Sequence, residues 1–169
     1  MNKDKVVLRY HCFYSDTFDI EDSLDKSDIE ILDSFINSDY FTDDFHSGQP
    51  INKEHPNHGP FYIKGLTTKD FKKFKPSDIE SIVNNFGQEK ILSGDLETFK
   101  DLWRETQEKI KNFQMSNGTI FHLDKFWFTD GDKQLTDWEY VFIYSLVFIF
   151  ISEDKKKLIS FDFCYCKLP

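Results

Sequence analysis

Three stretches of the chain place apolar residues three and four positions apart, the spacing of one face of an α-helix. The first follows Ser27, with Glu30 three residues later, a pair able to form a capping box at a helix start. The second follows Ser77 and Glu80 in the same arrangement, and Gly87 is placed to end it. The third has the longest pattern of this kind. The predicted helices run from Ser27 to Asn37, from Ser77 to Gly87, and from Gly94 or Asp95 to Asn117.

After the third helix the apolar period falls from 3.6 to 2, which indicates strands. Thr119–Phe128, Leu135–Ile151 and Lys157–Cys166 are rich in β-branched and aromatic residues and are separated by turn-forming residues. Consecutive strands with such short connections favour an antiparallel meander. We also predict an N-terminal strand over Lys5–Tyr14 and a short extended segment over Phe61–Lys64.

The last two predicted strands can be aligned by the chemistry of their side chains. If Ser152 lies opposite Lys157, Phe148 faces Phe161, and a ladder of apolar pairs forms on one side of the hairpin. A shift of one residue would mix this set with the more polar set, so we predict this register. The same alternation, carried into the preceding hairpin, defines an aromatic side and a mixed side. The aromatic side then contains Phe121, Leu123, Trp127, Trp138, Tyr140 and Phe142, and the mixed side contains His122, Asp124, Glu139 and Asp162.

These elements predict a single α+β domain over residues 1–169. An antiparallel sheet would combine the C-terminal three-stranded meander with the N-terminal strand, and about three helices would pack mainly on one face. The length of 169 residues is typical of one domain. The 19 Phe residues supply most of the core, because each buried aromatic side chain removes about 150–250 Å² from water.

Acidic side chains are concentrated in the N-terminal part of the chain. The net charge of −9 argues against nucleic-acid binding, which uses basic surfaces. Residues 1–60 contain 13 acidic and 5 basic side chains. Within Ser15–Phe45, 11 carboxylates accompany a single cation, Lys26. The stretch Lys69–Lys75 interleaves cations and aromatics, and we expect it to form a turn anchored by its two Phe residues and to pair with the acidic N-terminal region.

The chain lacks the features of an exported or membrane-spanning protein. Its N-terminus, MNKDKVVLRY, is charged and has no signal-peptide core. The longest apolar run, Tyr140–Ile151, is shorter than the roughly 20 residues that a membrane helix needs. The three cysteines, Cys12, Cys164 and Cys166, form no even-numbered disulfide framework. We therefore expect a soluble cytoplasmic protein without membrane contact.

Two groups of residues contain candidate metal ligands. His46, His55 and His58 lie within 13 residues of one loop, and histidine is a common zinc ligand. Cys164 and Cys166 project from one side of a predicted strand. Neither group has the ligand spacing of a known zinc motif. We therefore interpret the histidines as part of a polar loop and the cysteines as buried thiols, and we predict no metal or cofactor.

One alternative function is a small-ligand-binding domain or an enzyme with a pocket over the curved sheet. The sequence has no nucleophile elbow, phosphate loop or dinucleotide fingerprint. On the mixed side of the sheet, however, a histidine near carboxylates has the composition of a general base with an orienting partner. The residues of this alternative catalytic site are His122, Asp124, Glu139 and Asp162.

The interpretation that we favour is a non-catalytic protein-binding domain. The acidic N-terminal stretch would face a basic protein partner, because complementary charge speeds association and selects partners. Aromatic residues in the same stretch would anchor the contact. An acidic domain of this kind is typical of immunity and inhibitor proteins that neutralise a basic toxin or nuclease, and it would act as a monomer or homodimer. The predicted partner-binding residues are Asp28, Asp33, Asp39, Tyr40, Phe41, Asp43, Asp44 and Phe45.

Overall fold

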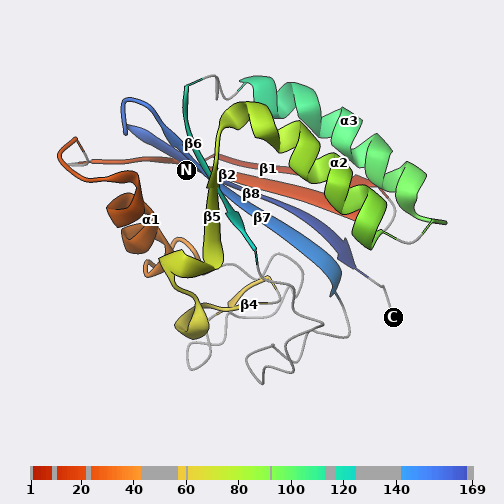
Figure 1. Cartoon of the computed structure of the whole chain (residues 1–169), viewed down its shortest axis with the longest axis horizontal. Helices are drawn as coiled ribbons and strands as arrows, with labels where there is room; N and C mark the ends of the chain where they lie inside the picture. Colours follow the sequence, from red (N-terminus) through yellow and green to blue (C-terminus); the bar gives the residue numbers. More distant parts are fainter. Residues whose placement is uncertain are drawn as a thin grey trace.

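The computed structural model contains a six-stranded antiparallel sheet with helices on both faces (Figure 1). It describes residues 2–8, 11–21, 24–42, 57–59, 61–91, 93–112, 117–124 and 142–166. The strand order is β1-β2-β8-β7-β6-β5, and a separate two-stranded sheet pairs β3 with β4. The strands are β1 (Asn2–Leu8), β2 (His11–Asp19), β3 (Asn57–His58), β4 (Phe61–Tyr62), β5 (Phe71–Phe74), β6 (Gly118–Leu123), β7 (Phe142–Ser152) and β8 (Lys157–Cys166).

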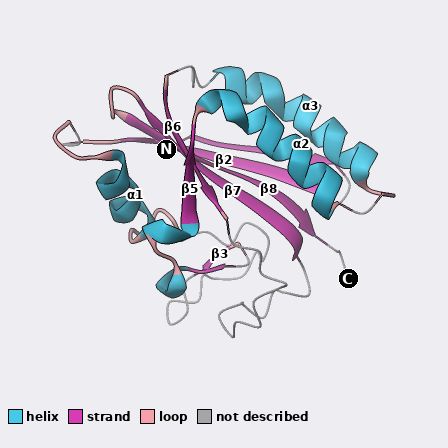
Figure 2. Ribbon diagram, viewed as in Figure 1, coloured by secondary structure: helices cyan, strands magenta, loops and turns pink. Residues whose placement is uncertain are grey.

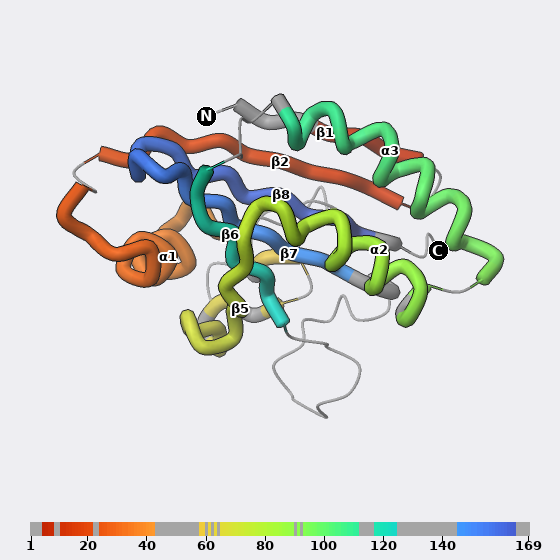
Figure 3. The backbone as a smooth tube through the Cα atoms, turned by 45° about the horizontal axis from the view of Figure 1, so that its top comes forward, coloured from red at the N-terminus to blue at the C-terminus, as the bar shows by residue number. Residues whose placement is uncertain are grey.

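In the described part of the chain, three α-helices cover the sheet, two on one face and one on the other (Figure 2). They are α1 (Asp28–Ile36), α2 (Ile79–Lys90) and α3 (Leu96–Asn112). Helices α2 and α3 run side by side, and α3 packs on β1 and β2 (Figure 3). The α+β architecture and the preference of the helices for one face are therefore as predicted. No helix in the described ranges has the length and apolarity needed to cross a membrane.

The two faces of the sheet bury separate hydrophobic cores. Under α2 and α3 lie aromatic side chains of the central strands, including Phe148 and Phe161, whose rings stack 5.1 Å apart. Under α1 lie Phe41, Phe121 and Val147. Because both faces are covered, β7 is apolar on both sides over most of its length, whereas β8 places the buried polar residues Ser160 and Asp162 on the side of α1.

The predicted alignment of β7 and β8 is confirmed. Phe148 lies opposite Phe161, Leu146 opposite Phe163, and Val147 opposite Asp162. Directly opposite residues in an antiparallel pair share a face, so the ladder of apolar pairs forms as expected.

The predicted faces of β6 are wrong. His122 lies opposite Phe148 and therefore belongs to the face under α2 and α3. Phe121 and Leu123 point into the core under α1. The alternation of apolar residues did not select the correct face, because both faces are buried and either assignment satisfies the hydrophobic pattern. Trp127, Trp138 and Tyr140 lie outside the described residues.

Two other predicted elements differ from the structure. The single strand expected over Lys5–Tyr14 is a hairpin of β1 and β2; the sequence between them contains no Gly, Pro, Asn or Asp to signal a turn. The turn expected over Lys69–Lys75 contains the edge strand β5. The predicted pairing of this stretch with the acidic region is confirmed, because Lys73 Nζ lies 2.9 Å from Asp28 Oδ2.

The predicted N-terminal cap is correct at α1 and incorrect at α2. At α1, Ser27 Oγ accepts from Glu30 N, and Glu30 Oε2 accepts from Ser27 N at 2.7 Å, which is the predicted capping box. At α2, a 3₁₀ turn precedes the helix, and Asp78 Oδ2 accepts from Lys75 N at 3.0 Å. Asp78, and not Ser77, therefore provides the side-chain cap of this segment.

Candidate functional site

A groove of about 420 Å³ separates the end of β2 from α1. Its apolar lining comes from both elements and from β8: Phe18 and Ile20 on the β2 side, Ile31 and Phe35 on α1, and Leu158 on β8. Ile31 and Phe35 are four positions apart and so lie on one helix face. Phe18 reaches the same space because it lies opposite Leu158 of β8, and directly opposite residues share a face of the sheet.

Polar and charged residues form the rim of the groove. Asp19 and Glu21 are exposed at its β2 side, and Lys26 is the one cation among the described residues that line it. The α1 side of the rim is Ser34, Ser38 and Tyr40. An apolar floor with a polar rim is the usual anatomy of a recognition site.

Tyr40 is the most exposed aromatic side chain near the groove, with 67% of its surface accessible. Its ring lies 5.5 Å from that of Phe18, and Phe18 lies 5.2 Å from Phe35. Aromatic residues at this spacing stabilise one another's positions. Tyr40 therefore contacts Phe18 at the edge of the groove, while most of its surface remains open to solvent.

Five exposed carboxylates on or next to α1 and the end of β2 have no salt bridge within the described part of the chain. Asp19 and Glu21 line the groove, whereas the other three lie before α1, on its solvent-facing side and in the turn after it. We call this set the acidic α1 surface: Asp19, Glu21, Asp25, Asp33 and Asp39. Two of the predicted partner-binding residues, Asp33 and Asp39, belong to this surface.

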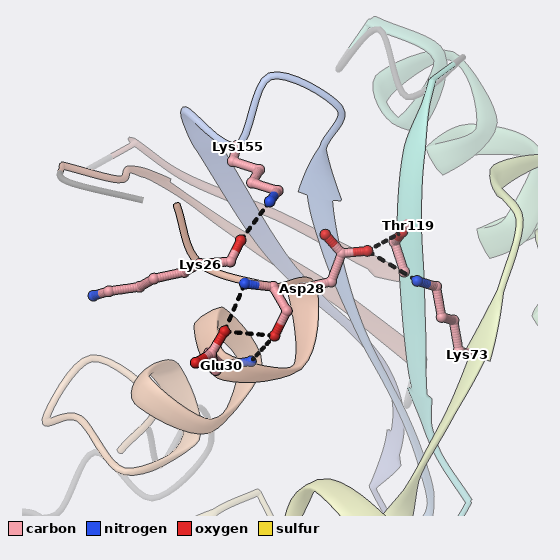
Figure 4. A network of polar contacts seen from close by, with 7 residues as sticks. Lys26, Asp28, Glu30, Lys73, Thr119 and Lys155 are labelled. Atoms are coloured by element: carbon pink, nitrogen blue, oxygen red, sulfur yellow. Dashed lines mark hydrogen bonds and ion pairs between the residues drawn. The ribbon is translucent and has the colours of Figure 1, made fainter. Parts of the chain in front are cut away.

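Asp28 was predicted to bind a partner, but it is engaged within the protein (Figure 4). Its Oδ2 accepts from Thr119 Oγ1 at 2.7 Å and from Lys73 Nζ at 2.9 Å. Partial burial alone would raise the pKa of Asp28, but these two hydrogen bonds and the charges of Lys73 and Lys155 hold it below its ordinary value. Asp28 therefore joins α1 to β5 and β6.

Other groups near the start of α1 are also engaged. Glu30 Oε2 accepts from Ser27 N and Oγ, each at 2.7 Å, and these bonds lower the pKa of Glu30. Lys155, in the β7–β8 turn, donates through Nζ to the main-chain oxygen of Lys26. The side chain of Lys26 points away from this network (Figure 4).

Phe41 was predicted to be a surface anchor and is instead fully buried. The turn that follows α1 directs it inward, with Phe41 N bonded to Ser38 O at 3.2 Å. Its ring stacks on His58 at 4.0 Å and contacts Phe35 at 5.5 Å. Asp43, Asp44 and Phe45 lie outside the described residues.

His58 is a structural residue in this arrangement. It is 2% exposed, its Nδ1 lies 2.7 Å from Phe41 O, and its Nε2 lies 3.0 Å from Asp162 Oδ1. Both ring nitrogens are thus used by protein acceptors, which leaves neither lone pair for a metal. His46 and His55 lie outside the described residues, and the described residues contain no cluster of three or more metal-ligating side chains.

Cys12 and Cys164 lie opposite one another on β2 and β8, both buried and both free thiols. Burial raises the pKa of the Cys164 thiol well above its ordinary value, and the nearby charge of Asp162 adds to this effect. A buried thiol with a raised pKa is unreactive.

The structure separates two of the alternative catalytic residues, because His122 and Asp162 lie on opposite faces of the sheet. His122 Nδ1 is 3.1 Å from Val147 O, and the ring stacks on Phe148 at 4.7 Å. Asp124 is exposed and forms an ion pair with Lys72, while Glu139 lies outside the described residues.

The protonation state of His122 follows from its surroundings. Burial lowers its pKa; the hydrogen bond to Val147 O and the charge of Asp124 oppose the shift, and Lys72 reinforces it. His122 is therefore neutral at neutral pH. It lines neither the groove beside α1 nor the cavity formed by Leu8, Thr98, Asp101, Arg104 and Glu105.

Sequence reasoning missed the groove itself. Phe18, Ile20 and Leu158 belong to strands that are distant in sequence, and their approach to α1 depends on the pairing of β2 with β8. A weak signal was present, because the strand pattern of β2 ends in an apolar pair, Phe18 and Ile20, between exposed carboxylates.

No protein-family description and no curated protein matches the chain. Two crystal structures of citrus MAF1 resemble the fold, with TM-scores of 0.45 and 0.44 and sequence identities of 13% and 14%. The matches cover 94% and 98% of this chain and 92% and 93% of the MAF1 chains. These similarities concern the arrangement of the backbone alone.

Proposed function

We propose that this protein is a non-catalytic binding domain that holds a basic protein partner through the acidic α1 surface. In its more specific form, the proposal is that the domain acts as an immunity or inhibitor protein and blocks a basic toxin or nuclease by covering its charged surface. This form follows from the charge of the chain and from the absence of catalytic motifs in its sequence.

The observation that supports the proposal best is the neighbourhood of Tyr40. Tyr40 is 67% exposed and directly follows Asp39, which is also exposed, in the turn after α1. Exposed Asp33 lies in the last turn of α1. Interface hot spots are enriched in tyrosine, and unpaired carboxylates around such an anchor speed the approach of a basic partner.

The alternative, an enzyme built around His122, has less support. His122 and Asp162 are separated by the sheet, and Asp162 is already bonded to His58. A general base must lie within hydrogen-bonding reach of its orienting partner or of a substrate. Binding through the acidic α1 surface uses side chains that are already exposed in the structure.

The proposal can be tested by capture from the source cell at low and moderate salt with three forms of the protein. The first is the wild type. The second carries Asp25→Asn, Asp33→Asn and Asp39→Asn, which removes three charges from the acidic α1 surface. The third carries Glu80→Gln, Glu89→Gln and Glu105→Gln, which removes three exposed charges from α2 and α3 on the other face.

We expect a basic protein to be captured by the wild type and by the α2/α3 variant, and to be lost from the acidic-surface variant. Moderate salt should weaken the capture, because exposed charges are screened over about 8–10 Å at physiological ionic strength. A partner held equally by all three forms would refute the role of the acidic α1 surface. Purified partner and a titration of its activity would then test the inhibitor form.

A further inference from the structure

We propose that the groove between β2 and α1 receives an apolar side chain, aromatic or long aliphatic, from a Lys- and Arg-rich segment of the partner protein. This inference rests on the proposed function and assigns to it a specific recognition site. It predicts that the partner is recognised by an apolar anchor flanked by cations, and not by charge alone.

The shape of the groove supports an apolar anchor. Its volume of about 420 Å³ lies within the range of about 300–1,000 Å³ that is typical of pockets that enclose ligand groups. Phe18 and Ile20 are only partly buried by the fold, although they pack on the core under α1. A side chain seated between them and Phe35 would remove this apolar surface from water.

Tyr40 adds a second surface for the anchor. One side of its ring is held by Phe18, and most of the ring remains accessible. Tyrosine has only two side-chain torsions and offers a large contact area, so it loses less conformational freedom on binding than a longer side chain would.

The charges around the groove favour positively charged residues on either side of the apolar anchor. The acidic α1 surface contributes Asp19, Glu21, Asp25, Asp33 and Asp39. The nearby cations are Lys26 at the rim, Lys155 and Lys156 in the β7–β8 turn, and Lys157 at the start of β8. Five carboxylates against four ammonium groups leave a small negative excess, and the groove lining itself has two carboxylates, Asp19 and Glu21, against the single cation Lys26. This excess favours a basic segment.

The same charges argue against other occupants. A second copy of the chain would bring one acidic α1 surface against another, and like charges across an interface oppose association. A nucleic acid would bring phosphates to the same carboxylates. A basic protein segment is the occupant whose charge matches the rim and whose side chains match the floor.

The test uses three synthetic peptides and the 169-residue chain labelled with ¹⁵N. The first peptide is a short Lys/Arg sequence with one central Trp, the second has Ala in place of Trp, and the third keeps Trp but replaces the cations with Ser. Binding is measured from amide shifts, which also locate the site.

Two protein variants provide the matched comparison. Ser34→Trp fills the groove from an exposed position of α1, where Ser34 Oγ donates to Glu30 O at 2.8 Å. Ser81→Trp makes the same change at an exposed position of α2, where Ser81 Oγ donates to Asp78 O at 2.9 Å. Neither changes the charge of the protein.

We expect the basic Trp peptide to bind about tenfold more tightly than the basic Ala peptide, as for a buried aromatic anchor. The largest changes in amide chemical shift should occur at Phe18–Glu21 and at Ser34–Tyr40. Ser34→Trp should abolish the advantage of the Trp peptide, and Ser81→Trp should preserve it.

The other outcomes separate the two proposals. Equal binding of the two basic peptides would overturn the groove site and leave the acidic surface intact. Equal binding of the basic and neutral Trp peptides would overturn the assignment of a basic partner segment. If no basic peptide binds even at low salt, both the groove site and the proposed function fail.

Discussion

His58 Nε2 lies 3.0 Å from Asp162 Oδ1, although the two residues are 104 positions apart in the chain. Both side chains are almost fully buried, at 3% and 2% exposure. His58 Nδ1 also faces an acceptor, Phe41 O, so Nδ1 carries a proton and Nε2 forms the hydrogen bond with Asp162. The result is a buried, hydrogen-bonded histidine–carboxyl pair that joins β3 to β8, with the His58 ring stacked on Phe41.

This relationship predicts strong coupling between the two residues. His58→Phe keeps the ring that stacks on Phe41 but removes both ring nitrogens, and it should lower the free energy of unfolding by about 2 kcal/mol, because it leaves the buried Asp162 carboxyl and Phe41 O without this hydrogen-bond partner. Asp162→Val should cost a similar amount. The double variant should lose less than the sum, since both members of the buried hydrogen bond are then removed.

Urea unfolding of the wild type, both single variants and the double variant completes the cycle. Strictly additive losses would contradict the pair, because additivity is expected only of residues that do not interact.

Phe148 should be a major contributor to the core under α2 and α3. It is fully buried between the rings of His122 and Phe161. Phe148→Ala should lower the free energy of unfolding by about 3–5 kcal/mol, the range for a buried aromatic residue. Leu24→Ala, at a position that is 71% exposed, is the matched control and should be nearly neutral. A loss below about 1 kcal/mol for Phe148→Ala would mean that this contact is not part of the core.

The sequence predicted those parts of the fold whose information is local or complementary. The capping box needs only Ser27 and Glu30, and the β7–β8 register follows from two adjacent strands whose side-chain patterns match. The face of His122 could not be predicted in this way, because β6 lies inside a sheet buried on both sides. There, tertiary packing of α1 and α2, and not periodicity, decides which face a residue joins.

The candidate site was predicted only in part for a similar reason. Tyr40 and Phe41 are neighbours with similar side chains, yet one is 67% exposed and the other 0%. The difference comes from His58, whose stacking on Phe41 selects the buried ring. Likewise, the carboxylates of Asp28 and Asp33 look equivalent in the sequence. Lys73 and Thr119, from distant strands, engage the first and not the second.

This difference between Asp28 and Asp33 is testable. Asp28→Asn should lower the free energy of unfolding by about 1 kcal/mol, because it weakens the ion pair with Lys73 and removes a favourable charge from the first turn of α1. Asp33→Asn should leave stability unchanged and weaken binding of a basic partner. Thermal unfolding and partner titration of both variants measure the two effects. If Asp28→Asn instead weakened binding and left stability unchanged, Asp28 would belong to the binding surface.

His11 should make the fold sensitive to mild acid. Burial lowers its pKa to about 4, against an ordinary value of 6.5, although the charge of Asp95 opposes the shift. Between these values the unfolded chain binds more protons than the folded chain, so stability falls as the pH drops. From pH 7 to pH 5 the loss from His11 should be about 1–2 kcal/mol, and His122 acts in the same direction.

His11→Phe isolates this contribution, since Phe retains a ring beside Phe99 but cannot be protonated. Unfolding at pH 7 and pH 5 should show a smaller difference for the variant than for the wild type. Measurement above pH 5 keeps the carboxylates of Asp28 and Asp154, whose pKa values are lowered, out of the comparison. Equal losses in the two proteins would show that His11 is not buried in its neutral form.

Gly87 should be required for the packing of α2 on α3, although its sequence position suggests a helix end. The helix continues past it to Lys90, and a Cβ at position 87 would lie 2.9 Å from Cε1 of Phe99, a ring that is 2% exposed. Gly87→Ala improves helix propensity by about 1 kcal/mol, but overpacking costs about 1–3 kcal/mol, so the variant should be less stable overall. Gly94→Ala meets no atom within 4 Å and should be neutral or slightly stabilising. A Gly87→Ala variant more stable than the wild type would show that the two helices are not in close contact at this point.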